Sequence, residues 1–102
     1  MVYNKLVRDK IPEIIGKTGK KATCRILSEA EYKEYLERKL DEEVAEFHAS
    51  KSIEELADII EVVKALAFTL DKDTFKLNDT YFKKNTERGG FAKRLCLIEV
   101  ED

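Results

Sequence analysis

Two pairs of acidic side chains are the residues of this sequence whose types and spacing point most directly to chemistry. Glu43 and Glu46 are three residues apart, and Glu55 and Asp58 repeat that spacing a short distance later. Residues three apart on a helix lie on the same side, so each pair presents two carboxylates together. Four carboxylates with few basic partners are typical of a hard-cation site, for which Mg²⁺ is the usual occupant.

The place of Glu43 on its helix supports this hypothesis. At about 100° per residue, the apolar side chains fall within an arc of roughly 120°; they are Tyr32, Leu36, Leu40, Val44 and Phe47. Glu43 falls inside this arc, whereas Glu46 lies about 60° to its side and Glu42 points outward to solvent. A carboxylate on a core face costs several kcal/mol unless it is paired or bound to metal. Because Glu-rich amphipathic helices are common without metal, a solvated acidic face stays open as the alternative.

Helix-start signals place the two acidic pairs on consecutive helices. A serine followed three residues later by glutamate, the pattern of a capping box, occurs at Ser28 and at Ser52. It predicts helices over residues 28–49 and 52–70. The short turn between them predicts an antiparallel hairpin whose acidic pairs converge near the turn. The second helix is apolar on nearly every side, so we expect most of it to be buried.

The remaining segments predict a mostly α-helical fold with a small β accessory. A short helix with a proline in its first turn is expected over residues 9–16. A third long helix is expected from Asp73, its cap, to the glycines at 89–90. Residues 22–27 and the tail from residue 91 are β-prone and are predicted to pair as two strands. The expected architecture is a helical hairpin plus a further long helix, assembled with other copies into an oligomeric bundle.

Length and composition narrow the class of protein. The 102 residues, 43% apolar and 39% charged, suit a single domain over residues 1–102. The net charge is +5 over residues 1–28, −8 over 29–61 and +1 over 62–102, which is not the continuous basic stripe of a protein that binds nucleic acid polymers. No run reaches the roughly 18 apolar residues of a membrane span, and the charged start argues against a signal peptide. We therefore expect a cytoplasmic protein that does not bind membranes.

The sequence contains one histidine and two cysteines, which argues against a zinc site or a histidine-activated nucleophile. His48 alone cannot supply a zinc protease site, and we expect it to be a capping or surface residue rather than a general base. Cys24 and Cys96 form neither a metal-binding pattern nor a disulfide framework. We expect both thiols to act as small apolar side chains in the packing.

Three motifs together resemble a known family. The acids form Glu42-Glu43-x-x-Glu46 followed by Glu55-Leu56-Ala57-Asp58, the string YNKLVRDKIP spans residues 3–12, and ERGGF spans residues 87–91. In this order they resemble the MazG-like, all-α nucleoside triphosphate pyrophosphohydrolases. The last two motifs resemble in particular a short, single-domain branch described as house-cleaning pyrophosphohydrolases. Phosphoribosyl-ATP pyrophosphohydrolase belongs to the same superfamily.

The resemblance implies a Mg²⁺-dependent hydrolase, with Mn²⁺ as a substitute ion, that forms a homodimer or a larger homo-oligomer. Its substrate would be a nucleoside triphosphate, canonical or modified, cleaved between the α- and β-phosphates to a nucleoside monophosphate and pyrophosphate. Glu43 and Glu46 would be catalytic, and the metal would bind Glu43, Glu46, Glu55 and Asp58. Only eight residues separate the two pairs, fewer than in larger MazG-type domains. The second pair therefore serves either the same ion or a second one.

Basic residues in both terminal segments are candidates for holding the phosphates, because cations stabilise charge on a transferred phosphoryl group. They are Lys5, Arg8, Lys10, Lys84 and Arg88. For each of them a solvated surface side chain is the alternative. Two other functions stay open: phosphoribosyl-ATP pyrophosphohydrolase, which shares the acidic motif, and a catalytically silent helical module that binds a nucleotide or a protein.

Overall fold

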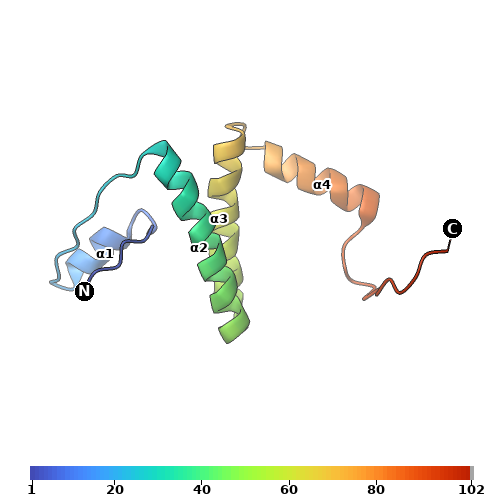
Figure 1. Ribbon diagram of the computed structural model, residues 1–102, viewed down its shortest axis with the longest axis horizontal. Helices are drawn as coiled ribbons and strands as arrows, with labels where there is room; N and C mark the ends of the chain where they lie inside the picture. Colours follow the sequence, from blue (N-terminus) through green and yellow to red (C-terminus); the bar gives the residue numbers. More distant parts are fainter. Residues whose placement is uncertain (102) are drawn as a thin grey trace. The chain divides into compact units, whose positions relative to one another are not determined.

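The computed structural model describes residues 1–101, and its regular structure is entirely helical over that range (Figure 1). Its elements are α1 (Ile11–Lys17), α2 (Glu29–Ser50), α3 (Ile53–Leu70) and α4 (Lys76–Arg88). The mostly α-helical fold is confirmed. The chain forms two compact units, Met1–Lys72 and a second from Asp73 onward, and the single domain expected over residues 1–102 stays a prediction. No helix in the described residues is long and apolar enough to cross a membrane.

Helix α2 begins where the sequence places it. The Ser28 hydroxyl accepts a hydrogen bond from the Glu31 N–H (3.2 Å), and the Glu31 carboxylate accepts one from the Ser28 N–H (3.1 Å), which completes the capping box. The helix ends at Ser50. Lys51 then adopts a left-handed conformation (φ 55°), and its N–H donates to the carbonyl of Phe47 at 2.7 Å. This reversal turns the chain directly into α3.

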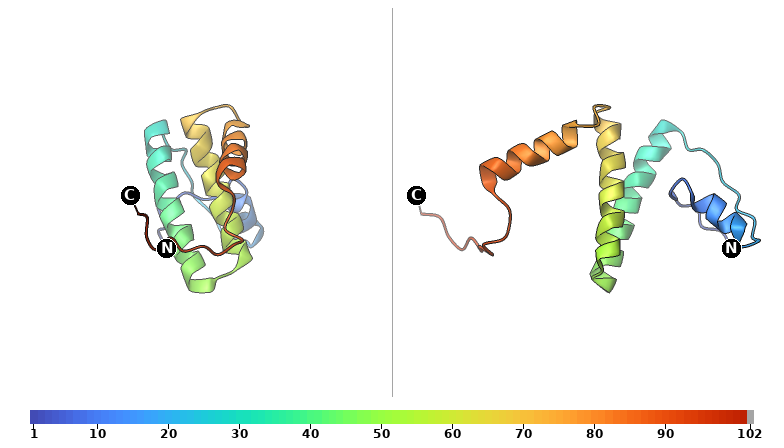
Figure 2. Two further views of the ribbon diagram at one scale, coloured as in Figure 1. Left: turned by 90° about the vertical axis from the view of Figure 1, so that its right-hand side faces the viewer. Right: turned by 180° about the vertical axis from the view of Figure 1, so that it is seen from behind.

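Helix α3 begins with only half of its predicted capping box. The Ser52 hydroxyl accepts from the Glu55 N–H at 3.4 Å, but the Ser52 N–H donates to the Ser50 hydroxyl instead of the Glu55 carboxylate. The Glu55 carboxylate is therefore available to face α2. Helices α2 and α3 lie side by side as an antiparallel hairpin in all the views of Figures 1 and 2.

The core of the hairpin is small. Leu36 of α2 is 3% exposed and Val62 of α3 is 7% exposed, and the other buried side chain is the carboxylate of Glu43. Within the unit Met1–Lys72, α3 is not mostly buried as expected, because α2 covers only one side of it. The large apolar side chains of α3 that stay exposed are Ile53, Leu56, Ile60, Phe68 and Leu70.

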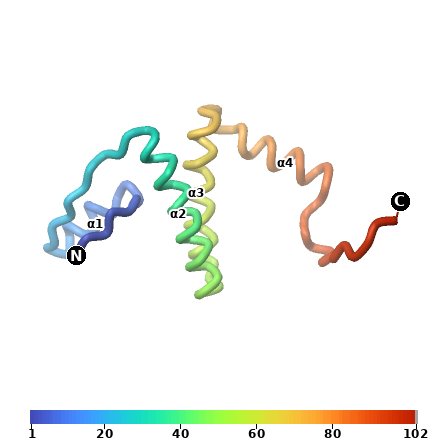
Figure 3. The backbone as a smooth tube through the Cα atoms, viewed as in Figure 1, coloured from blue at the N-terminus to red at the C-terminus, as the bar shows by residue number. Residues whose placement is uncertain are grey.

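The N-terminal part of this unit contains the short predicted helix and an extended connection. Helix α1 has Pro12 in its first turn, as expected, and ends at Lys17, one residue past the predicted end. Residues 18–28 run from α1 to α2 without regular structure (Figure 3). No strand forms in the described residues, so the predicted two-stranded accessory is not found there. Two short strands alone are marginally stable in water, which agrees with this result.

The second unit consists of α4 and the tail that follows it. The Asp73 carboxylate accepts from the Phe75 N–H at 2.9 Å, one turn before the helix, which begins at Lys76 rather than next to Asp73. Gly89 ends α4 with a positive φ of 76°, a conformation that favours glycine. The glycine end of the helix is therefore confirmed, and its start is two residues later than a cap at Asp73 implies.

Candidate metal centre

The acidic side chains converge where α2 and α3 face one another near their turn. One group contains Glu42, Glu43 and Glu46, and a second contains Glu43, Glu55 and Asp58. Within each group, one carboxylate oxygen of every residue lies within 4.8 Å of the others. Glu43 belongs to both groups and links them: Glu46 shares the first group with it, and Glu55 and Asp58 share the second. Glu42 is the additional member.

This convergence follows from helical spacing and from the capping of α3. Glu43 and Glu46 point to the same side of α2 because they are three residues apart, and Glu55 and Asp58 do so on α3. The short turn at Lys51 sets the first two turns of α3 beside the last two turns of α2. Because the Glu55 carboxylate takes no part in the cap, it joins Asp58 opposite Glu43.

The Glu43 carboxylate is the buried centre of the site. The residue is 6% exposed, its Oε2 atom has no hydrogen-bond partner, and its Oε1 atom lies 3.4 Å from Nζ of Lys39. Burial raises the pKa of Glu43, and the nearby charge of Glu46 raises it further. The Oε2 atom of Glu55 is also buried without a partner. Two carboxylate oxygens are thus buried without a hydrogen-bond donor from the protein.

The position of Glu42 differs from the outward, solvated one that the sequence predicted. It does not point freely into solvent, because its side chain is only 31% exposed and contacts two lysines. Its Oε1 atom accepts from Lys5 at 3.2 Å and its Oε2 atom from Lys39 at 3.4 Å. Burial alone would raise the pKa of Glu42, but the hydrogen bond from Lys5 and the charge of Lys39 together lower it. Helix geometry alone could not reveal Lys5, which comes from a distant segment.

Lys39 is a residue of this site that the sequence reasoning missed. It lies one turn before the acids on α2, its side chain is 18% exposed, and its ammonium contacts both Glu42 and Glu43. The spacing of three and four residues to these glutamates was the signal that could have identified it. Lys39 neutralises part of the charge of the cluster.

The basic N-terminal segment lies against the same acids. A guanidinium nitrogen of Arg8 lies 3.6 Å from Oδ1 of Asp58, and Lys5 pairs with Glu42. Two of the predicted phosphate-binding residues therefore lie beside the acidic cluster. The third from this segment, Lys10, is exposed and forms no ion pair with the described residues. The structure brings the acids together with cations from a segment more than 30 residues away.

The other predicted residues lie outside this cluster. Lys84 and Arg88 are exposed on α4 in the second unit. His48 is exposed near the end of α2, where its ring centre lies 6.0 Å from that of Phe47. Cys24 and Cys96 are exposed free thiols, so the expectation that they fill apolar space is wrong for the single chain.

The donor set of the cluster fits a hard divalent cation. Every candidate ligand atom is a carboxylate oxygen, the kind that Mg²⁺ prefers. The desolvated oxygens of Glu43 and Glu55 have no protein donor, and a cation between them would supply the missing charge. Glu43, Glu46, Glu55 and Asp58 are the residues that would hold it.

Comparison with known proteins assigns no activity. The chain is 53% identical over 45 residues to a protein of Mycolicibacterium smegmatis (strain ATCC 700084 / mc(2)155) that is described only as uncharacterized. The match covers 44% of this chain and 46% of the relative, so it spans less than half of either protein. No protein-family model and no solved structure matches the chain.

Proposed function

We propose that this protein is a Mg²⁺-dependent nucleoside triphosphate pyrophosphohydrolase that releases a nucleoside monophosphate and pyrophosphate. The observation that carries the proposal is the buried Glu43, with an unpartnered oxygen, at the point where two carboxylate groups meet. An acidic cluster alone is a weak signal. A desolvated carboxylate facing three further acids is costly for folding, and a metal-binding role explains why the cost is tolerated.

The residues divide into two roles. Glu43, Glu46, Glu55 and Asp58 would hold the ion. When bound, Mg²⁺ polarises phosphate oxygens and lowers the pKa of a bound water. The carboxylates of Glu43 and Glu46 fix the position of the site on a rigid helix, because they project from adjacent turns of α2.

The N-terminal cations would bind the polyphosphate. Lys5 and Arg8 contact Glu42 and Asp58 with side chains that are 45% and 56% exposed, so both contacts are accessible to solvent. Exposed ion pairs contribute little stability and exchange partners at small cost. A nucleoside triphosphate carries several negative charges, whereas a carboxylate carries one. Lys5 and Arg8 would therefore leave their carboxylate partners for the phosphates as a nucleotide binds.

The uncovered face of α3 favours a homodimer or a larger bundle. Exposed apolar side chains along one helix are unfavourable in water, and a second copy of the chain presents a matching apolar face. The finer architecture of an oligomeric helical bundle therefore belongs to this proposal.

The test is release of pyrophosphate from a panel of canonical and modified nucleoside triphosphates, with Mg²⁺ and with a chelator. We expect Mg²⁺-dependent release that Glu43→Gln reduces by at least about 100-fold. Glu37→Gln is the matched control, because Glu37 is an exposed glutamate of the same helix outside the cluster. No turnover of any nucleotide would refute the proposal.

The same panel separates the alternatives. Phosphoribosyl-ATP is included, and a rate on it far above the rates on all nucleoside triphosphates would reassign the substrate. Calorimetry that shows nucleotide binding without hydrolysis in the presence of Mg²⁺ would identify a silent binding module instead.

A further inference from the structure

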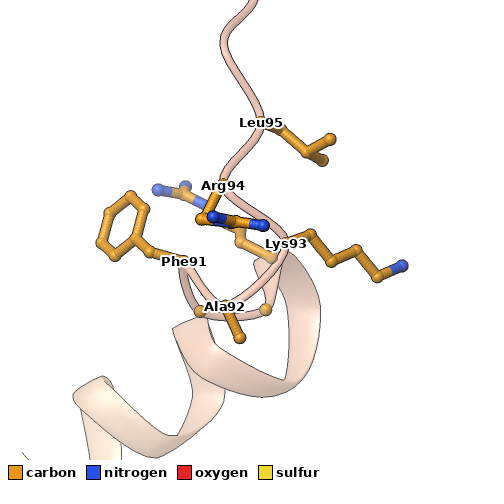
Figure 4. Close-up of a pocket in the computed structure, with 8 residues that line it drawn as sticks. Phe91, Ala92, Lys93, Arg94 and Leu95 are labelled. Atoms are coloured by element: carbon orange, nitrogen blue, oxygen red, sulfur yellow. The ribbon is translucent and has the colours of Figure 1, made fainter.

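A second candidate binding site lies in the unit from Asp73 onward, where α4 ends. Residues 88–95, with the sequence RGGFAKRL, surround a hollow of about 490 Å³ (Figure 4). The turn closes with a hydrogen bond from the Arg94 N–H to the Phe91 carbonyl at 3.0 Å. Gly89 and Arg94 both have positive φ, 76° and 56°, so the backbone is folded back sharply on each side of Phe91.

The hollow carries uncompensated positive charge. Arg88, Lys93 and Arg94 line it, and the segment contains no acidic residue. Within the described part of their unit, none of the three forms an ion pair. Like charges held close together repel one another, so the arrangement favours an anion with several negative oxygens.

Backbone donors add to this charge. The N–H groups of residues 90–93 lie outside the helix and donate to no acceptor among the described residues. Successive N–H groups in a tight turn form a concave site for anions. The turn therefore offers both guanidinium and amide donors, the two kinds of group that bind phosphate in proteins.

Phe91 supplies a flat apolar surface beside the cations. It is 96% exposed, and no ring or cation among the described residues stacks on it. Figure 4 shows the Phe91 ring on one side of the turn and the Lys93 side chain extended on the other, with Arg94 between them. A fully exposed phenylalanine next to phosphate-binding groups is the arrangement that base stacking uses.

We infer that residues 88–95 bind a free nucleotide, with its phosphates on Arg88, Lys93, Arg94 and the backbone N–H groups and its base on Phe91. The choice of a nucleotide as the ligand rests on the proposed function. The binding itself depends only on groups within this turn. The inference assigns nucleotide recognition to Phe91, Lys93 and Arg94, all of which lie within this one unit.

The test is titration calorimetry of the full chain with ATP, tripolyphosphate and adenosine, in chelator, so that binding is measured without metal and without turnover. Phe91→Ala should weaken the binding of ATP by about fivefold or more, the loss expected for one stacked base. The same substitution should leave the binding of tripolyphosphate unchanged. R88Q/K93Q/R94Q should weaken both. K20Q/K21Q/K33Q removes the same charge at three exposed lysines outside the turn and should change neither.

Amide NMR spectra locate the binding. Only four glycines occur in the chain, and ATP should shift the signals of Gly89 and Gly90 but not those of Gly16 and Gly19. Shifts confined to other residues, equal losses in both triple variants, or an effect of Phe91→Ala on tripolyphosphate would each overturn the inference. If Mg²⁺-dependent pyrophosphate release occurs while Gly89 and Gly90 stay unshifted, the turn is refuted and the proposed function stands. Shifts at this turn without any hydrolysis would support the inference and refute the function.

Discussion

Replacing Glu43 by glutamine should make the metal-free protein more stable and remove its response to Mg²⁺. The carboxylate is 6% exposed and has one oxygen without a partner. A buried polar group left unsatisfied costs about 1–3 kcal/mol, and a charged group costs more; the contact with Lys39 offsets part of that cost. Glutamine keeps the shape, and its amide can donate to the Glu46 or Glu55 carboxylate. We expect a gain of about 1 kcal/mol, which raises Tm by about 4–8 °C for a chain of this size.

The stabilisation that Mg²⁺ gives should be smaller in Glu43→Gln than in the parent protein, although the metal-free variant is more stable. At about 100 times its dissociation constant, a metal that binds only the folded state stabilises it by about 2.7 kcal/mol, equivalent to an increase in Tm of about 10–20 °C. Because Glu43 belongs to both carboxylate groups, Glu43→Gln should lose most of this increase. Differential scanning calorimetry in chelator and in Mg²⁺ measures both effects.

Glu42→Gln is the matched control, one residue away on the same helix. Its carboxylate holds two lysines and its pKa is lowered, so the substitution removes favourable contacts. The metal-free variant should therefore lose no more than about 1 kcal/mol of stability, and its Tm should fall accordingly. Most of the Mg²⁺ response should remain. Shifts of the same sign in both metal-free variants, or a full Mg²⁺ response in Glu43→Gln, would refute this account of the site.

Three further predictions concern the rest of the molecule. Arg25 donates to Glu31 and lowers its pKa to about 2; because this folded-state pKa lies below the unfolded value near 4.5, its stabilisation should be present above pH 4.5 and lost on acidification toward pH 2. Melting curves of Glu31→Gln should lack this component. Arg8→Gln should raise KM about 10-fold while metal-free Tm changes little, because its ion pair is exposed; an unchanged KM would exclude phosphate binding. Light scattering should give at least twice the chain mass of 11.8 kDa, and Ile60→Glu should lower it; a monomer at micromolar concentration would contradict the proposed dimer.

Local signals in the sequence predicted the helices and the acidic cluster well. The capping box at Ser28 fixed the start of α2, and spacing of three residues identified the four acids that converge. Contacts between distant segments were not predictable in this way. The pairing of Lys5 with Glu42 joins residues 37 positions apart, and no periodicity encodes it. It is also the reason why Glu42 is not the solvated side chain that its helical angle implied.

The error about α3 has a physical cause that bears on function. Counted at about 100° per residue, Glu55, Asp58 and Val62 fall on one side of α3, which is the side that α2 covers. Leu56 and Ile60, both exposed, fall on the adjacent side. The apolar surface is thus two faces rather than one, and α2 covers only the first. Because the acids lie on the covered face, a second copy packed on Leu56 and Ile60 would leave the carboxylates in place, so α3 can serve the metal site and an interface at once.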